Sequence, residues 1–206
     1  MKRYFITGIG TNVGKTFVSA ILTEALKADY WKPVQTGIIE SSDVNDVSRL
    51  ISNQKTQFHR ESYSFTAPVS PHLAAAIEND TIELSNINVP ETKNNLIIEG
   101  AGGLLAPLNK ASYVIDLAKK FDAEIVLVIR NYLGCINHSL LSIDYLMSHN
   151  FKVKGIVLNG NFDALVEDAI TSYAPIPVLA KFLDMNRVNQ HVVEDLARSI
   201  DKDTWL

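Results

Sequence analysis

The chain begins with a strand-like segment, a glycine-rich turn and a helix-like segment, in that order. Residues 3–7 are rich in apolar side chains, residues 8–14 contain three glycines, and Lys15-Thr16 leads into a second apolar stretch. This order suits a phosphate-binding loop, in which backbone N–H groups of the turn and of the helix N-terminus surround a polyphosphate. Lys15 would reach the outer phosphates, and the Thr16 hydroxyl would ligate Mg²⁺.

The glycine spacing departs from the usual G-x-x-x-x-G-K-[ST] pattern of such loops. Ile9 stands where the first glycine belongs, with Gly8 and Gly10 on either side of it. A simple turn between a strand and a helix is the alternative interpretation. Because a strand precedes the motif and a helix follows it, we interpret the segment as a nucleotide-binding loop.

The composition fits a soluble enzyme with a single domain. The 206 residues can form one large core, and 47% apolar against 20% charged residues excludes a disordered or fibrous chain. A net charge of −4, without a basic stripe, argues against a nucleic-acid partner. Cys135 is the only cysteine, which excludes an internal disulfide and fits a cytoplasmic location. No apolar run approaches the roughly 18 residues of a membrane span, and the start of the chain does not resemble a signal peptide.

Apolar and amphipathic segments alternate along the chain. The segments 95–99, 124–130 and 153–159 are apolar at successive positions, which is typical of a parallel sheet covered by helices on both faces. We therefore predict one doubly wound, mainly parallel α/β domain over residues 1–206, with right-handed crossovers and similar to P-loop NTPases.

The expected elements follow from these patterns. Strands are predicted at 3–7, 30–34, 95–99, 124–130, 153–159 and 177–180. Helices are predicted at 15–28, 43–53, 71–79, 112–122, 136–149, 162–173 and 190–201. Residues 54–94 contain three prolines and show no clear periodicity, so their structure is not predicted beyond the one helix.

Polar residues at the carboxyl ends of the strands mark the expected site, because ligands of such sheets bind there. Glu99 ends one strand and would lie beside the Gly-Lys-Thr turn; a solvated carboxylate is the alternative. Mg²⁺ takes hard oxygen ligands and usually one or two carboxylates, so Glu99 would hold it together with Thr16. Asp43 and Asp46 both fall in the first turn of a helix, where capping is the alternative role, and spacing does not distinguish them. The metal set that we predict is Thr16, Asp46 and Glu99.

Lys32 is the second cation expected at this edge. Pro33 disfavours the helical conformation for the residue before it, so Lys32 is held extended at a strand end. A solvated lysine is the alternative, but two ammonium groups near each other need an anion between them. The γ-phosphate of ATP and an anionic substrate would supply it, and we predict Lys15 and Lys32 as catalytic residues. His72 and His138 are interpreted as ordinary histidines at helix starts.

Five segments together resemble the dethiobiotin synthetase family, in the family's order. They are T-G-x-x-T-x-V-G-K-T at 7–16, K-P-V-x-T-G at 32–37, S-P-H at 70–72, E-G-A-G-G at 99–103 and L-G-C-I-N-H at 133–138. Each motif alone is weak, whereas the set of five is highly specific.

The resemblance implies an ATP- and Mg²⁺-dependent enzyme that makes dethiobiotin from 7,8-diaminopelargonate and CO₂. One amine of the substrate would capture CO₂ as a carbamate, and the carbamate would attack the γ-phosphate of ATP. The neighbouring amine would then close the ring, which releases phosphate. Positioning and charge neutralisation are the main requirements of such phosphoryl transfer.

The resemblance also implies roles for individual residues. Contacts with the nucleotide and its metal would come from Thr11, Asn12, Val13, Gly14, Lys15, Thr16, Phe17, Asp46, Glu99, Gly100, Ala101, Gly102, Asn159, Gly160, Phe182 and Leu183. Within this set, Asn159 would bind adenine, and the backbone after Glu99 would position the carbamate and phosphates together with Thr36. The substrate carboxylate would be bound by the turn of Gly134, Cys135, Ile136 and Asn137, contributed by the other subunit of a homodimer.

The chain departs from the family at three places, one of which is the short segment between Gly37 and Asp46, where the choice between Asp46 and Asp43 lies. The family often has acidic residues where this chain has Gly10 and Asn12, and its usual G-E-I-P near adenine is replaced by Ala-Lys-Phe-Leu at residues 180–183. Two other functions are alternatives. A partitioning-type ATPase would carry a lysine early in its phosphate loop, where this chain has Gly10, and a non-catalytic nucleotide-binding scaffold would not explain Lys32.

Overall fold

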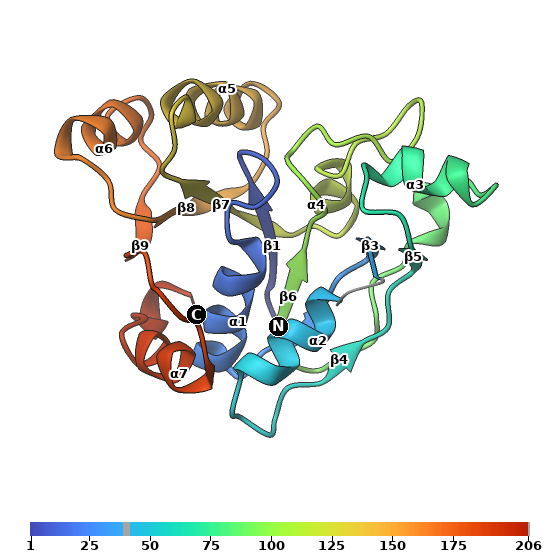
Figure 1. The fold of residues 1–206 in the computed structure, drawn as a ribbon, viewed down its shortest axis with the longest axis horizontal. Coiled ribbons are helices and arrows are strands. Elements are labelled where there is room, and N and C mark those ends of the chain that lie inside the picture. Colours follow the sequence, from blue (N-terminus) through green and yellow to red (C-terminus); the bar gives the residue numbers. More distant parts are fainter. Residues whose placement is uncertain (39–41, 206) are drawn as a thin grey trace.

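The computed structural model describes residues 1–38 and 42–205, and a seven-stranded sheet runs through its centre (Figure 1). The strand order is β4-β2-β6-β1-β7-β8-β9, and every pairing within this sheet is parallel. The strands are β1 (Arg3–Gly8), β2 (Asp29–Trp31), β4 (Phe58–His59), β6 (Leu96–Glu99), β7 (Glu124–Arg130), β8 (Val153–Asn159) and β9 (Val178–Phe182). The predicted doubly wound, parallel α/β fold is confirmed.

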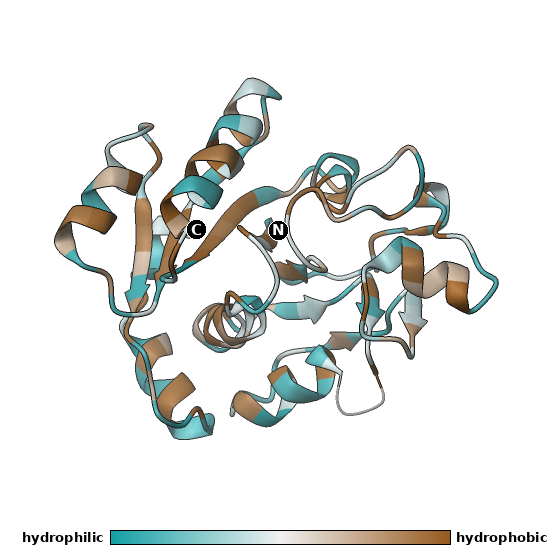
Figure 2. Ribbon diagram, turned by 45° about the horizontal axis from the view of Figure 1, so that its top comes forward, coloured by the Kyte–Doolittle hydropathy of each residue, from teal (hydrophilic) through white to brown (hydrophobic). Residues whose placement is uncertain are grey.

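Helices cover the two faces of the sheet. On one side α1 (Lys15–Leu26) packs against α2 (Asp43–Leu50) and α7 (Gln190–Arg198), while α5 (Cys135–Ser148) packs against α6 (Ala164–Thr171) on the other (Figures 1 and 2). The middle strands β6, β1 and β7 are buried over nearly their whole length, and Figure 2 shows the apolar colouring of the sheet between the helices. Burial on both faces explains why these strands are apolar at successive positions.

The predicted strand 30–34 is two strands in two sheets. β2 ends at Trp31, and β3 (Val34–Thr36) pairs in parallel with β5 (Tyr63–Phe65) in a separate two-stranded sheet. Pro33 has no N–H group and cannot continue the hydrogen-bond ladder, so the first sheet ends there. Its carbonyl oxygen instead accepts hydrogen bonds from the N–H groups of Ser62 (2.9 Å) and Tyr63 (3.0 Å). Lys32 therefore sits in the connection between the two sheets.

The remaining helices begin and end within a few residues of the predicted bounds. They are α3 (Pro71–Ile77) and α4 (Asp116–Lys120), with short 3₁₀ turns at Leu84–Asn86 and Lys202–Thr204. The predicted helix 112–122 is shorter at its start because Tyr113 forms an antiparallel bridge with Pro107. Among the described residues, no helix has the length and apolar character needed to cross a membrane.

Candidate active site

The phosphate loop joins β1 to α1, and its conformation depends on two glycines. A Cβ atom on Gly8 would lie 2.4 Å from Cγ2 of Val13, and one on Gly14 would lie 2.2 Å from Nδ2 of Asn159. Gly14 also has a φ of +93°, which favours glycine. Ile9 is buried and donates its N–H to the carbonyl of Val128 (3.2 Å). Ile9 thus continues the pairing of β1 with β7 by one residue, and the loop turns after it.

Lys15 is the first residue of α1 and lies inside the loop. Its ammonium donates to the carbonyl oxygen of Gly10 at 3.0 Å, and the residue is 7% exposed. Burial lowers the pKa of Lys15 from 10.5 to about 8, with the Glu99 carboxylate acting in the opposite direction. The loop therefore holds a desolvated cation at the start of a helix, where the N–H groups of the first turn also favour an anion.

Thr16 lies between two carboxylates. Its hydroxyl Oγ1 is 2.9 Å from Oδ1 of Asp43 and 2.9 Å from Oε1 of Glu99. Three elements meet here, because Thr16 is on α1, Asp43 is the first residue of α2 and Glu99 is the last residue of β6. Glu99 is 1% exposed. A hydroxyl and two carboxylates form a set of hard oxygen donors of the kind that holds Mg²⁺.

Lys32 reaches the same two carboxylates from the β2–β3 connection. Its ammonium pairs with Oδ2 of Asp43 and lies 3.2 Å from Oε1 of Glu99. Burial alone would lower the pKa of Lys32, but the Glu99 and Asp43 carboxylates outweigh it and raise the pKa above its ordinary value. Burial likewise opposes the charge on Asp43, and Lys32 more than offsets it, so the pKa of Asp43 is lowered. Lys32 is therefore a fixed positive charge in the site.

The structure places Asp43, rather than the predicted Asp46, beside Thr16. Ser42 caps α2 through a hydrogen bond from the N–H of Asn45 (3.3 Å), and the Asp43 N–H donates to Oε1 of Gln35 (3.1 Å). These contacts begin the helix at Asp43 and direct its carboxylate to Thr16. Asp46 lies almost one turn further along, where its half-exposed carboxylate is 3.9 Å from Arg49. Asp46 is therefore not among the residues brought together with Thr16 and Glu99.

Lys15, Thr16, Lys32, Asp43 and Glu99 all line one cleft of about 860 Å³, which extends to residues 68–71. Of the residues predicted from the sequence, it is lined by Thr11, Asn12, Gly14, Lys15, Thr16, Phe17, Lys32, Thr36, Glu99, Ala101 and Gly102. It is also lined by residues that the sequence analysis did not assign, including Gln35, Asp43, Gly103, Ala106 and residues 68–71. The S-P-H motif at 70–72 was a signal for the last of these.

Gly100 does not contribute its N–H to this cleft. That N–H donates to the carbonyl of Ile6 at 2.9 Å and so belongs to the β1–β6 pairing. Gly100 is not among the described residues that line the cleft, whereas Ala101 and Gly102 do line it, and the predicted contacts of this backbone with phosphates stay predictions.

A second group of predicted residues lies at the carboxyl ends of β8 and β9. The N–H of Gly160 donates to the carbonyl of Phe182 (2.7 Å), and the ring of Phe182 packs edge-to-face on Phe17 with centroids 5.7 Å apart. Leu183 is 66% exposed beside them. Asn159 donates Nδ2 to the carbonyl of Val13 at 2.8 Å. These residues border the loop, and their contacts with a base stay predictions.

The predicted substrate turn lies apart from the cleft of its own chain. Gly134, with φ +102°, precedes α5, which begins at Cys135 rather than at Ile136. Cys135 is buried, and its thiol lies 3.7 Å from Oδ1 of Asn131. None of residues 134–137 is among the described residues that line the cleft. His138 pairs with the Tyr132 hydroxyl (2.7 Å), as expected of a histidine with a local role.

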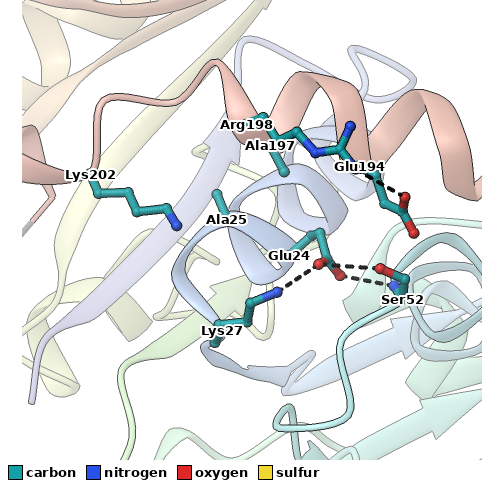
Figure 3. Close-up of a pocket in the computed structure, with 8 residues that line it drawn as sticks. All are labelled: Glu24, Ala25, Lys27, Ser52, Glu194, Ala197, Arg198 and Lys202. Atoms are coloured by element: carbon teal, nitrogen blue, oxygen red, sulfur yellow. Dashed lines mark hydrogen bonds and ion pairs between the residues drawn. The ribbon is translucent and has the colours of Figure 1, made fainter.

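A smaller hollow of about 270 Å³ lies between α1 and α7, far along α1 from the phosphate loop (Figure 3). Figure 3 shows Lys27 and Ser52 directed at the carboxylate of Glu24. That carboxylate also accepts from the N–H (2.9 Å) and Nδ2 (3.1 Å) of Asn53. Burial opposes the charge, but these donors lower the pKa of Glu24 from 4.5 to about 2. The hydrogen bonds to Glu24 therefore hold Ser52 and Asn53, which follow α2, against α1.

The comparisons with known proteins agree with this geometry. The family described as an AAA domain matches residues 2–191. An ATP-dependent dethiobiotin synthetase from Cytophaga hutchinsonii is 46% identical over 206 residues, which is 100% of this chain and 99% of that protein. One from Christiangramia forsetii is 45% identical over 201 residues, which is 98% of this chain and 97% of that protein.

A solved structure shows the fold alone. The septum site-determining protein MinD from Pyrococcus horikoshii, complexed with Mg-ADP, is similar with a TM-score of 0.55 and 13% identity, over 98% of this chain and 96% of that chain. The near full-length identity to the curated relatives is more specific. This chain belongs to the ATP-dependent dethiobiotin synthetase family, a family of ligases.

Proposed function

We propose that this chain converts 7,8-diaminopelargonate, CO₂ and ATP to dethiobiotin, ADP and phosphate in the cytoplasm. The observation that carries the proposal is the convergence of Lys15, Lys32, Thr16, Asp43 and Glu99 on one cleft beside a phosphate loop. Its relatives of 45–46% identity are named ATP-dependent dethiobiotin synthetases, which supports this substrate set.

The proposed reaction has three steps. One substrate amine adds to CO₂ and loses a proton, which gives a carbamate. A carbamate oxygen then attacks the γ-phosphorus of ATP, and ADP leaves. Finally the neighbouring amine attacks the carbamate carbon, phosphate leaves, and a five-membered cyclic urea is formed.

The two lysines address the main electrostatic obstacle of the second step, which is the repulsion between the carbamate and the γ-phosphate. Lys15 lies within the loop that would surround the phosphates, and Lys32 approaches from the opposite wall of the cleft. Preorganised cations of this kind stabilise charge that develops in a transition state. Thr36 and the backbone of Ala101 and Gly102 line the same space and would position the reacting groups.

Mg²⁺ fits the donor set of Thr16, Asp43 and Glu99. The hydroxyl and the two carboxylates are hard oxygen ligands, and two carboxylates are within the number that Mg²⁺ usually takes from a protein. When bound, Mg²⁺ would neutralise charge on the triphosphate. Asp43 replaces Asp46 in the metal set that we now propose.

We also propose a homodimer in which Gly134, Cys135, Ile136 and Asn137 bind the substrate carboxylate of the partner's site. The position of this turn outside the cleft of its own chain supports the idea. The N–H groups at the start of α5 would face the carboxylate.

Labelled bicarbonate tests the function directly. We expect incorporation of label into an acid-stable product that requires both ATP and the diamine, with one ADP formed per product. ATP hydrolysis that is indifferent to the diamine would instead favour a partitioning-type ATPase. Binding of ATP without turnover would favour a non-catalytic scaffold.

A further inference from the structure

The two oxygens of the Glu99 carboxylate have different partners. Oε1 accepts hydrogen bonds from the Thr16 hydroxyl (2.9 Å) and the Lys32 ammonium (3.2 Å). Oε2 accepts one from the hydroxyl of Tyr30 at 2.9 Å. The carboxylate is therefore oriented, with Oε1 directed toward Thr16 and Lys32 and Oε2 held by Tyr30.

Strand register explains why Tyr30 can reach Glu99. Tyr30 on β2 lies opposite Ile97 on β6, and Glu99 is two residues beyond Ile97. Residues two apart on a strand point to the same face of a sheet, and neighbours in register share that face. The side chains of Tyr30 and Glu99 thus lie on one face, with the tyrosine hydroxyl directed along the sheet toward its carboxyl edge.

Tyr30 is suited to act as a rigid donor. The residue is fully buried, and its ring packs near Phe58 with centroids 6.0 Å apart. A tyrosine hydroxyl is a neutral hydrogen-bond donor. A neutral donor leaves the negative charge of Glu99 in place for a cation on its other side.

We propose that Tyr30 is a positioning residue, whose hydroxyl orients the Glu99 carboxylate so that Oε1 is presented with Thr16 and Asp43 to the nucleotide-bound metal. This inference rests on the metal set of the proposed function. Groups that hold metal-ligating carboxylates by hydrogen bonds contribute to metal affinity without touching the metal. Tyr30 lies outside the five motifs that carry the family resemblance, because it precedes the K-P-V-x-T-G segment at 32–37.

The test compares ADP binding with and without Mg²⁺ by isothermal titration calorimetry. The ratio of the two dissociation constants measures the gain that the metal gives. Tyr30→Phe removes one oxygen and keeps the ring, so we expect metal-free ADP to bind as in the unchanged chain and the gain from Mg²⁺ to fall by about tenfold or more. Glu99→Gln should reduce the gain further, and the double variant should match Glu99→Gln alone.

Tyr4→Phe is the matched control. Tyr4 is also fully buried, and its hydroxyl bonds to the carbonyl of Trp205, away from the cleft. This variant should leave the gain from Mg²⁺ unchanged, and thermal unfolding of both variants checks that each is folded.

Three results would overturn the inference, and they separate its failure from that of the proposed function. A normal gain in Tyr30→Phe, with the gain lost in Glu99→Gln, would refute the role of Tyr30 and leave the metal set intact. Equal loss of affinity for metal-free ADP and Mg-ADP in Tyr30→Phe would show a general structural role. A normal gain in Glu99→Gln would refute the metal set itself, and the role of Tyr30 with it.

Discussion

The side-chain amide of Asn159, at the end of β8, donates a hydrogen bond of 2.8 Å to the carbonyl of Val13 in the phosphate loop. The amide fits there because Gly14 has no side chain, since a Cβ atom on Gly14 would lie 2.2 Å from Nδ2 of Asn159. A residue expected to bind adenine therefore also holds the loop that would bind the phosphates.

Asn159→Ala tests this second role. We expect weaker binding of inorganic triphosphate as well as of ATP, because the loop loses the hydrogen bond that fixes it, with a cost of about 0.5–1.5 kcal/mol for triphosphate. Binding constants for the two ligands can be measured by calorimetry. Unchanged affinity for triphosphate, with a loss confined to ATP, would limit Asn159 to contact with the base.

Asp43 and Asp46 make a second, internally controlled comparison. Asp43→Asn should raise the Mg²⁺ concentration needed for half-maximal turnover by at least about tenfold, because removing even a group that supports a metal ligand typically weakens metal binding by that much. Asp46→Asn should have little effect, because its carboxylate lies beside Arg49 on the exposed side of α2. Steady-state rates over a range of Mg²⁺ concentrations distinguish the two. The reverse ranking would restore Asp46 to the metal set.

Lys32→Gln should fold and still bind ATP, because Lys15, Thr16 and the loop backbone remain. Loss of one preorganised electrostatic donor costs about 2.7–4 kcal/mol of transition-state stabilisation, so turnover should fall by about 10²–10³. The Lys32→Arg variant should also turn over slowly, since a planar guanidinium does not reproduce a compact ammonium between two carboxylates. Near-normal turnover, or complete loss of ATP binding, would contradict the catalytic role of Lys32.

Glu24 gives a prediction of pH dependence. Its pKa is lowered from 4.5 to about 2 in the folded chain, so it stabilises the fold above pH 4.5, and this contribution is lost as the pH falls toward 2. Glu24→Gln should therefore reduce the free energy of unfolding at pH 7 by about 1–3 kcal/mol. Denaturant unfolding of both chains should show the difference narrowing below pH 4.5. A difference independent of pH would mean that packing rather than charge is responsible.

A mixing experiment tests the shared site. Chains with Lys15→Gln and chains with Asn137→Ala should each be inactive, and subunit exchange between them should restore part of the activity. Some mixed dimers would then contain one site with both residues intact. Absence of recovery in a mixture shown to exchange subunits would argue that each site is built from one chain.

The positions of two site residues could be predicted from the sequence, because local patterns determine where these residues lie. Glu99 ends an unbroken apolar strand, and Lys32 is placed by Pro33, so both could be predicted to reach the Gly-Lys-Thr turn. In the structure Glu99 accepts a hydrogen bond from Thr16, and Lys32 pairs with Glu99. Their contacts with ligands stay predictions.

The sequence left open features that depend on contacts with other segments of the chain. The start of α2 at residue 43 was predicted, but the carboxylate of its first turn that lies beside Thr16 was not: the Asp43 N–H bonds to Gln35 of β3, outside residues 42–50, and the Asp43 side chain contacts Thr16. The two-residue strand β4 and the three-residue strand β5 are too short for periodicity to be visible. The Gly100 N–H is used by the β1–β6 pairing, a contact that depends on register rather than on composition.

The central place of β1 has a consequence for how the chain folds. Arg3 pairs with Leu96 of β6, and Tyr4 pairs with Glu124 of β7, so both neighbours of this strand are made long after it. Closing such long loops before the pairings can form makes folding slow. Until then an apolar strand and the phosphate loop attached to it have no partner, which is the condition under which nascent chains aggregate and chaperones act. The strand that leads into the phosphate loop is thus also one that waits long for its partners during synthesis.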